Sequence, residues 1–365
     1  AMRTAGLNLV EASAAGSVAG VAGKTFVLTG TLPTLGRDEA RDLIDIKVRL
    51  DHMTQAGVDV QVLFPTLFLR PVTTEYDCEL ALIRSYNRWV ADAWRQSGNR
   101  LRWVAIPPLY SMPDPGVIRA ELEFCKANGA CGVFMRGFEC ERLASDRYFM
   151  PLYKIAEELD LPICFHAGNN SFANHDSYTR DLGVMIFKFP VMGVFLQLLS
   201  EQIPQRFPKL RWAFIEASAQ WVPYMMREAR NRLLAKGVRT GDDILRANNF
   251  YVTTQKSDDL PWLLSEVGDD IFVIGTDYGH KDDAVEIEAL KRLGAEGKIT
   301  AAAASKIVLD SGMVMQMDII PVSRGPFCYA NAEDGVVLAD PQLQAELQSR
   351  SPDCWRRLVA RRDWM

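Results

Sequence analysis

The sequence predicts an α/β protein with the fold of a (β/α)8 TIM barrel and a C-terminal helical extension. Two observations predict this class. Short apolar runs alternate with amphipathic stretches through most of the 365 residues, and each run is apolar almost throughout, as is typical of parallel strands covered on both faces. There are eight such runs, which is the number of strands in a barrel of roughly 250 residues.

The eight expected strands follow one another along the chain, with helical patterns between them. The strands are 26–30, 58–64, 101–106, 131–136, 162–166, 211–216, 249–254 and 271–276. The clearest helical patterns are 79–96, 115–129 and 150–160. A doubly wound sheet is the alternative, but about six strands suffice for it, and no G-x-G-x-x-G motif follows the first run.

The chain divides into three parts. Residues 1–22 are small and polar without periodicity, so we expect a flexible lead-in. Residues 23–317 hold the eight repeats, and residues 318–365 form the expected C-terminal extension. The loop after the fifth strand, 167–189, is long, which is typical of a lid or substrate loop at the mouth of a barrel.

Composition limits the classes of function. With 41 basic and 46 acidic residues the net charge is −5, so there is no electrostatic reason to expect nucleic acid as a partner. No apolar run approaches the roughly 18 residues of a membrane-spanning helix. The seven cysteines are odd in number and include no C-x-x-C motif, which argues against disulfides and a structural zinc site. We therefore expect a cytoplasmic protein that acts on a small molecule, with neither nucleic acid nor membrane as partner.

Polar residues stand at the C-terminal ends of the expected strands, where barrel enzymes carry their active sites. His166 ends the fifth strand and Glu216 the sixth, while Asp277 follows the eighth with His280 close behind. Histidine and carboxylate groups at one mouth can hold a divalent metal or exchange protons. A strand-end histidine can also be purely structural, but three such residues at one mouth favour a functional site.

Arg136 ends the fourth strand, which is otherwise apolar. A guanidinium keeps its charge and binds planar anions, so a substrate carboxylate is one natural partner. A salt bridge to Glu139 or Glu141 in the next loop is an equally open alternative. Asn169 and Asn170, directly after the fifth strand, are further candidates for substrate binding.

Five segments stand in a specific order and spacing over about residues 46–317. They are RLDHMTQAGVDVQVLFPT (49–66), LPICFHAG (161–168), RFPKLRWAFIEASAQWVPY (206–224), IGTDYGHKD (274–282) and SKIVLDSG (305–312). Together they resemble the amidohydrolase superfamily, and within it the aminocarboxymuconate-semialdehyde decarboxylase group. The resemblance implies a barrel enzyme that carries out metal-dependent nonoxidative decarboxylation or hydrolysis of a small carboxylic acid. The aromatic residues of the loop 167–189 suit an aromatic or conjugated acid, and packing is an equally open alternative for them.

The resemblance also implies roles for individual residues. By motif, His166 and Asp277 match metal ligands of the fifth and eighth strands, and Glu216 stands where the sixth strand often carries a histidine. The family has an H-x-H pair in the first strand, whereas Thr29 and Thr31 stand there in this sequence. Threonine hydroxyls are poor ligands for a transition metal. We therefore expect a divalent metal, zinc or else manganese, that is weakly bound.

Asp277, His280 and Glu216 are the expected acid–base groups. Two alternatives stay open: a metal-free relative that uses His166, Asp277 and His280 for isomerisation or hydration, and a binding protein without catalysis. Because barrels of this branch often dimerise, a homodimer is a further option.

The segment AGKTFVLTGTLPTLGRDEARDLI (22–44) resembles the start of a BRCT domain of NAD-dependent DNA ligases. It is too short for a complete domain of that kind, so no ligase function is implied. We expect residues 24–31, which include the run 26–30, to supply the first barrel strand or else to sit beside the barrel.

Overall fold

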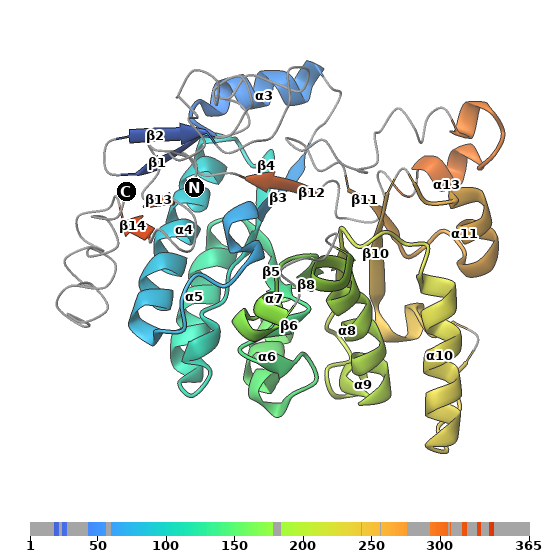
Figure 1. Cartoon of the computed structure of the whole chain (residues 1–365). Helices are drawn as coiled ribbons and strands as arrows, with labels where there is room; N and C mark the ends of the chain where they lie inside the picture. The colour runs from blue at the N-terminus through green and yellow to red at the C-terminus, as the bar shows by residue number, and fades with distance from the viewer. Residues whose placement is uncertain are drawn as a thin grey trace.

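An eight-stranded parallel sheet forms the centre of the fold (Figure 1). The computed structural model describes residues 18–21, 24–27, 43–55, 60–177, 184–241, 243–255, 257–275, 293–305, 307, 316–319, 327–329 and 336–338. In spatial order the strands are β11 (Phe272–Ile274), β10 (Phe250–Thr254), β9 (Trp212–Ile215), β8 (Ile163–His166), β5 (Ala130–Arg136), β4 (Leu101–Ala105), β3 (Gln61–Pro65) and β12 (Gln316–Ile319).

Seven of these strands lie where the sequence predicts them. Every neighbouring pair in the sheet is parallel. These strands are continuous apolar runs in the sequence because both faces of the sheet are covered, so polar residues do not alternate with apolar ones. The curved parallel sheet with helices outside it confirms the (β/α)8 fold class.

The N-terminal segment departs from the prediction. β2 (Lys24–Val27) pairs with β1 (Val18–Val21) in a separate antiparallel sheet of two strands. The position beside β3 is held by β12, whose residues Gln316 to Ile319 pair in parallel with Val62 to Pro65. The prediction that residues 24–31 supply the first barrel strand is therefore wrong for residues 24–27. An apolar run identifies a strand, but it does not identify the strand's neighbour.

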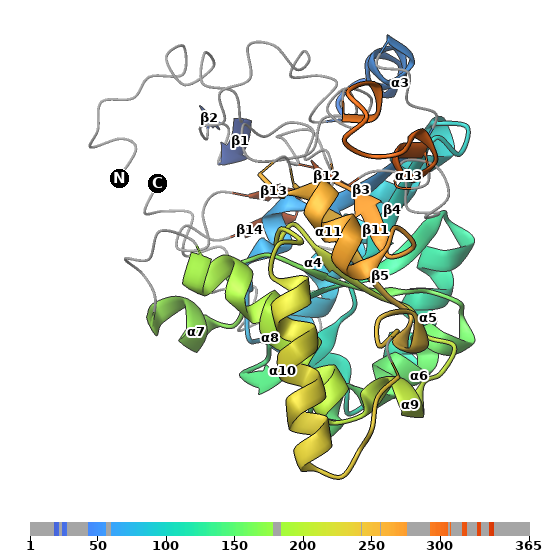
Figure 2. The ribbon, with the colours of Figure 1, turned by 90° about the vertical axis from the view of Figure 1, so that its right-hand side faces the viewer.

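Helices lie along the outer face of the curved sheet (Figures 1 and 2). The main ones are α4 (Tyr76–Gln96), α5 (Pro115–Ala127), α6 (Met150–Glu158), α8 (Phe189–Ser200), α10 (Val222–Ala235) and α11 (Leu260–Val267). The first three confirm the clearest helical patterns in the sequence. Two of these helices have an N-terminal capping residue: the carboxylates of Asp114 and Asp259 accept hydrogen bonds from backbone N–H groups in the first turns of α5 and α11.

Shorter elements connect or flank this framework. They are the helices α3 (Ile46–Gln55), α7 (Phe172–Ser177), α9 (Ile203–Arg206) and α13 (Ala301–Ser305), and the hairpins β6 (Phe138–Glu139) with β7 (Arg142–Leu143) and β13 (Phe327–Tyr329) with β14 (Val336–Leu338). The described part of the expected extension 318–365 is thus mainly a β-hairpin, and its predicted helices lie outside the described residues. In the described part of the chain, no helix combines the length and apolar character needed to cross a membrane.

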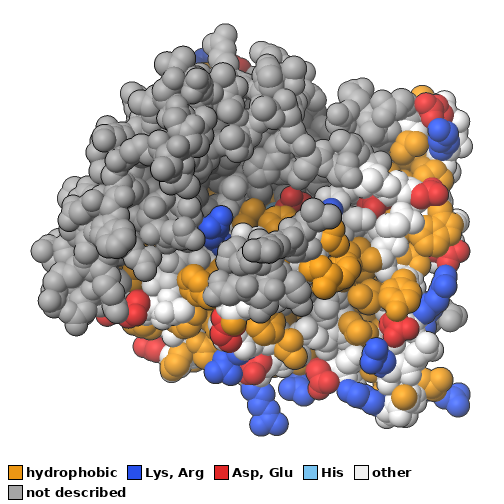
Figure 3. Space-filling model, in the orientation of Figure 1, with side chains coloured by type: hydrophobic (Ala, Val, Ile, Leu, Met, Phe, Trp, Pro, Cys, Tyr) orange, Lys and Arg blue, Asp and Glu red, His pale blue; other side chains and the backbone are white. Residues whose placement is uncertain are grey.

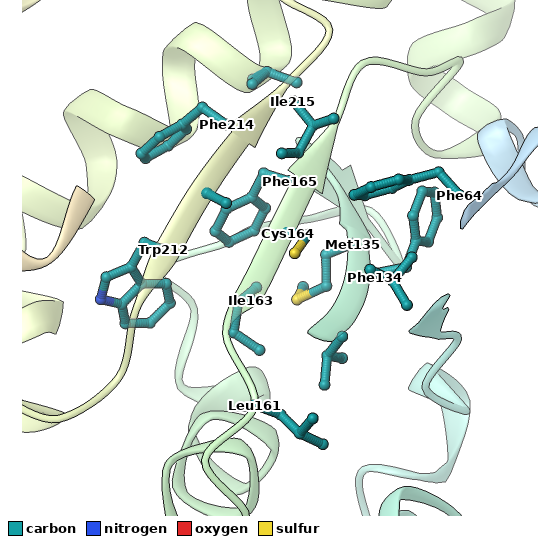
Figure 4. Packing of buried hydrophobic residues seen from close by; sticks show 14 of the residues in the cluster. Phe64, Phe134, Met135, Leu161, Ile163, Cys164, Phe165, Trp212, Phe214 and Ile215 are labelled. Carbon is teal, nitrogen blue, oxygen red and sulfur yellow. The ribbon is translucent and has the colours of Figure 1, made fainter. Parts of the chain in front are cut away.

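Aromatic side chains fill the space between the sheet and its helices (Figure 4). The ring of Phe214 lies 5.4 Å from Phe195 of α8 and 5.1 Å from Phe250. Phe165 stacks beside Phe214 on the same face. Burying a phenylalanine side chain fully, relative to leaving it exposed, contributes roughly 1.5–3 kcal/mol to the stability of the fold. Because successive side chains of a strand point to opposite faces, His166 projects away from this layer.

Candidate active site

The described part of the candidate site lies at the C-terminal edge of β5, β8 and β9. Arg136 pairs in register with His166, and His166 with Ile215, the residue before Glu216. Since the strands are parallel, their C-terminal ends meet at one edge, so the structure brings Arg136, His166 and Glu216 together as predicted from the sequence. Asp277 and His280 follow β11 in the sequence, but they lie outside the described residues.

His166 is fully buried and held in one orientation. Its Nδ1 lies 2.6 Å from the carbonyl oxygen of Ala167. Because a carbonyl oxygen can only accept, Nδ1 carries the proton, and the lone pair of the neutral ring is on Nε2. The rings of Phe64 and Phe134 lie 5.2 and 5.9 Å from the imidazole, which gives it an apolar surround.

Glu216 approaches the same imidazole from β9. Its Oε2 lies 3.4 Å from Nδ1 of His166, and only 7% of the residue is exposed. The backbone at Glu216 is left-handed, with φ of 60°, a conformation that non-glycine residues adopt mainly where the surrounding structure imposes it. Here the N–H of Glu216 donates to Oγ1 of Thr253 on β10 at 2.7 Å. The neighbouring strand thus helps to fix the carboxylate beside the histidine.

This pair has the donor chemistry of part of a metal site. Histidine ligands usually donate their second ring N–H to a backbone carbonyl or a carboxylate; Nδ1 of His166 is hydrogen-bonded to the Ala167 carbonyl and lies 3.4 Å from the carboxylate of Glu216. A metal would then bind at Nε2, with Glu216 orienting the ring. Among the described residues no three His, Cys, Asp or Glu side chains converge as a complete metal site. His166 and Glu216 therefore fit part of a divalent-ion site, and the predicted ligand Asp277 lies outside the described residues.

Arg136 has a protein partner of its own. Its Nε and Nη2 lie 2.8 and 2.5 Å from the two carboxylate oxygens of Glu139, and Nη1 donates to the carbonyl of Phe68 at 3.2 Å. The two side chains are 11% and 3% exposed. Of the two alternatives for Arg136, the structure shows the salt bridge, and binding of a substrate by Arg136 stays a prediction.

The two asparagines after β8 belong to a tight connection. The buried Asn170 accepts the N–H of Phe138 at 3.0 Å and donates to the carbonyls of Gly168 and Ile186. The backbone N–H of Asn169 donates to Leu69, 2.5 Å away. Asn170 therefore joins the connection after β8 to the segments at Phe138 and Ile186 through hydrogen bonds. Substrate binding by either asparagine stays a prediction.

A cation that the sequence analysis missed also reaches this edge. Lys188 ends a π-helical turn, η4 (Val184–Lys188), and its Nζ donates to Oε1 of Gln255 at 2.9 Å. Gln255 directly follows β10 and is 4% exposed. Such π-helical turns occur frequently at functional sites, but no sequence pattern marks this one.

A small cavity lies beside the site, between the loops that follow β3, β4 and β5. Its lining includes Phe68, Arg70, Glu79, Tyr110, Arg136 and Cys140. The carboxylate of Glu79 accepts the N–H groups of Leu109 and Tyr110 at 3.1 and 2.9 Å. Burial raises the pKa of Glu79 to about 8, against the opposing effect of these two hydrogen bonds. Glu79 belongs to a helical pattern in the sequence, so only the structure shows that it faces the mouth.

Comparisons with known proteins agree with this fold. A family model described as amidohydrolase matches residues 25–302. The match takes in residues 25–44, and the resemblance of that segment to a BRCT domain is not supported.

Solved structures that resemble the chain share less than a quarter of its sequence, so they show the fold alone. An amidohydrolase from Mycobacterium avium subsp. paratuberculosis has a TM-score of 0.63 at 20% identity, over 75% of this chain and 74% of that one. The 2,6-dihydroxybenzoate decarboxylase from Rhizobium has a TM-score of 0.58 at 20% identity, over 72% and 84%. A dihydroxybenzoic acid decarboxylase from Polaromonas, with bound manganese and the inhibitor 2-nitroresorcinol, has a TM-score of 0.57 at 20% identity, over 72% and 83%.

Proposed function

The chain belongs to the amidohydrolase family, and from that premise we propose that it is a metal-dependent enzyme that decarboxylates or hydrolyses a small aromatic carboxylic acid. The observation that carries the proposal is the buried pair of His166 and Glu216 at the C-terminal edge of the sheet. An imidazole fixed in one tautomer beside a carboxylate suits metal binding and proton transfer. The structural neighbours that decarboxylate dihydroxybenzoates support the choice of an aromatic acid.

Each predicted site residue has a defined part in this proposal. Nε2 of His166 and the carboxylate of Asp277 would hold the ion, zinc or manganese, which when bound acts as a Lewis acid on an oxygen of the substrate. The Ala167 carbonyl keeps the proton of His166 on Nδ1. Glu216 stabilises that N–H electrostatically and makes Nε2 a stronger base. The proton that replaces a lost carboxylate is assigned to Asp277 or His280.

A metal-free relative is the less favoured alternative. The contact between Nδ1 and a backbone carbonyl places the lone pair of His166 on Nε2, which is the usual arrangement of a metal-binding histidine. A cofactor-free acid–base site would not require this contact.

The same proposal places the enzyme in the cytoplasm, acting on a small molecule. The described cysteines Cys78, Cys125, Cys131, Cys140 and Cys164 are free thiols, which supports a reducing compartment. Figure 3 shows acidic and basic side chains interspersed on the described surface of one face. This mixture supports the expectation that nucleic acid is not a partner, because polyanion binding relies on a surface with clustered basic residues.

The test is turnover of defined acids by protein of known metal content. The protein is stripped with a chelator, reloaded with zinc or manganese, and incubated with 2,6-dihydroxybenzoate and related benzoates. Chromatography follows loss of the acid and formation of the decarboxylated or hydrolysed product. We expect turnover that requires the metal and disappears in His166→Ala. His52→Ala is the matched control, because His52 lies on α3, which contacts the opposite ends of the strands through the bonds Arg49–Gln61 and Arg100–Thr54. Equal turnover in stripped and loaded protein would contradict the proposal.

A further inference from the structure

We propose that Lys188 binds the carboxylate of the substrate and that Gln255 positions its ammonium group for this contact. The inference rests on the proposed function and moves anion recognition away from Arg136. It identifies the substrate as an acid that binds in its ionised form, with its carboxylate directed to the part of the mouth near β10.

The charges at the mouth distinguish the two cations. Arg136 meets both oxygens of Glu139, and this pair is almost entirely buried. A substrate carboxylate could take that place only by leaving Glu139 buried without its cation, which is strongly unfavourable. Within the described residues, by contrast, the one polar contact of the Lys188 ammonium is the neutral amide oxygen of Gln255. A neutral acceptor uses one of the three N–H donors and leaves the positive charge uncompensated.

The position of Lys188 is set by the chain that follows His166. The N–H of Gly168 donates to the carbonyl of Phe187 at 3.3 Å, and the side chain of Asn170 donates to the carbonyl of Ile186. The end of the π-helical turn is therefore bonded to the connection directly after His166. Lys188 is the next residue after these bonded positions, and its side chain extends to Gln255 at the end of β10.

Gln255 is itself well fixed. Its backbone N–H donates to Oδ2 of Asp258 at 2.7 Å, and the same carboxylate accepts the N–H of Ala219 at 2.9 Å. Ala219 lies three residues after Glu216, so one carboxylate joins the ends of β9 and β10. The amide of Gln255 can therefore hold the ammonium at the edge that carries His166 and Glu216, while a glutamate in its place would neutralise it.

The test compares the binding of benzoate and benzamide, which have the same ring and differ in charge. Isothermal titration calorimetry is performed on the full chain, both chelator-treated and zinc-loaded. A charge-assisted hydrogen bond changes affinity by roughly 10- to 100-fold, so Lys188→Met is expected to weaken benzoate binding by that factor and to leave benzamide binding unchanged. Gln255→Glu, which retains the lysine but adds a carboxylate beside it, is expected to have the same effect. Lys126→Met is the matched control, because Lys126 is exposed at the C-terminal end of α5 and bonds to the carbonyl of Asp160.

The outcomes separate this inference from the proposed function. If wild-type protein shows no preference for benzoate, or if both variants keep it, the role of Lys188 is overturned. If the variants lose the preference although no acid is turned over, Lys188 binds anions and the proposed function fails. If aromatic acids are turned over and Lys188→Met leaves their KM unchanged, the proposed function stands and the role of Lys188 fails. Circular dichroism and the Tm show whether each variant is folded. Lys188→Met and Gln255→Glu change different residues, so a folding defect in one of them still leaves the other as a test.

Discussion

Replacing Arg136 with methionine tests whether this guanidinium stabilises the mouth of the barrel or binds the substrate. Methionine retains an apolar stem but lacks the charge, so the 97% buried side chain of Glu139 loses the cation that contacts both of its oxygens. Removing one partner of a buried ion pair costs about 3–5 kcal/mol. At about 2.1 cal/mol/K of unfolding entropy per residue, a chain of 365 residues loses roughly 1.3 °C of Tm per kcal/mol, so the Tm of Arg136→Met should fall by about 4–7 °C.

The double variant Arg136→Met/Glu139→Leu removes both charges and should recover most of this loss, because no unpaired charge remains buried. Arg119→Met is the control. Its pair with Glu158 is exposed, at 40% and 41%, and exposed pairs contribute only about 0–1 kcal/mol. Thermal unfolding followed by circular dichroism measures all three. A wild-type Tm in Arg136→Met, together with a raised KM for the acid, would refute this reasoning and make Arg136 a substrate ligand.

Three further predictions follow from the residues around the site. Burial raises the pKa of Glu79 from 4.5 to about 8, so between these pH values the folded protein keeps a proton that the unfolded chain has lost. The contribution of Glu79 to stability is therefore full below pH about 4.5 and is lost as the pH rises to about 8. The urea midpoints of wild type and Glu79→Gln should diverge across this pH range, and parallel curves would disprove the prediction. Glu216→Gln removes the charge beside Nδ1 of His166 and should lower metal affinity or turnover by about 10–100-fold, measured as metal content after dialysis and as kcat; unchanged values would show that Glu216 is structural. At Gly168 a Cβ would lie 2.5 Å from the carbonyl oxygen of Leu69, so Gly168→Ala should cost about 1–3 kcal/mol, and a Tm equal to that of wild type would show that the connection can move.

The sequence predicts the sheet well because one physical signal dominates it. Strands covered on both faces must be apolar throughout, and β4, β5, β8 and β10 show this in runs that match the structure within a few residues. The ends of these strands also locate His166 and Glu216, since parallel strands share one C-terminal edge.

Partners of charged groups are harder to predict, because they depend on contacts across loops. From the sequence alone, a substrate carboxylate and Glu139 are equally possible partners of the Arg136 guanidinium. Only the structure shows that two of its nitrogens contact Glu139. Lys188 gives no sequence signal, because a π-helical turn has no characteristic pattern and the bond to Gln255 joins residues 67 positions apart. Glu79 similarly becomes a buried acid only because α4 packs beside the loop at Leu109.

The position of β12 changes the argument about the metal. Thr29 and Thr31 weaken the expected ligand set only if residues 24–31 form the strand beside β3, where the family places its first pair of ligands. β12 holds that position instead, and residues 24–27 pair with β1. The expectation of weak metal binding thus loses its premise at residues 24–27, while Thr29 and Thr31 themselves lie outside the described residues. Under the proposed function, metal affinity depends on the ends of β8 and β9, where the backbone orients the buried pair of His166 and Glu216, together with the predicted ligand Asp277.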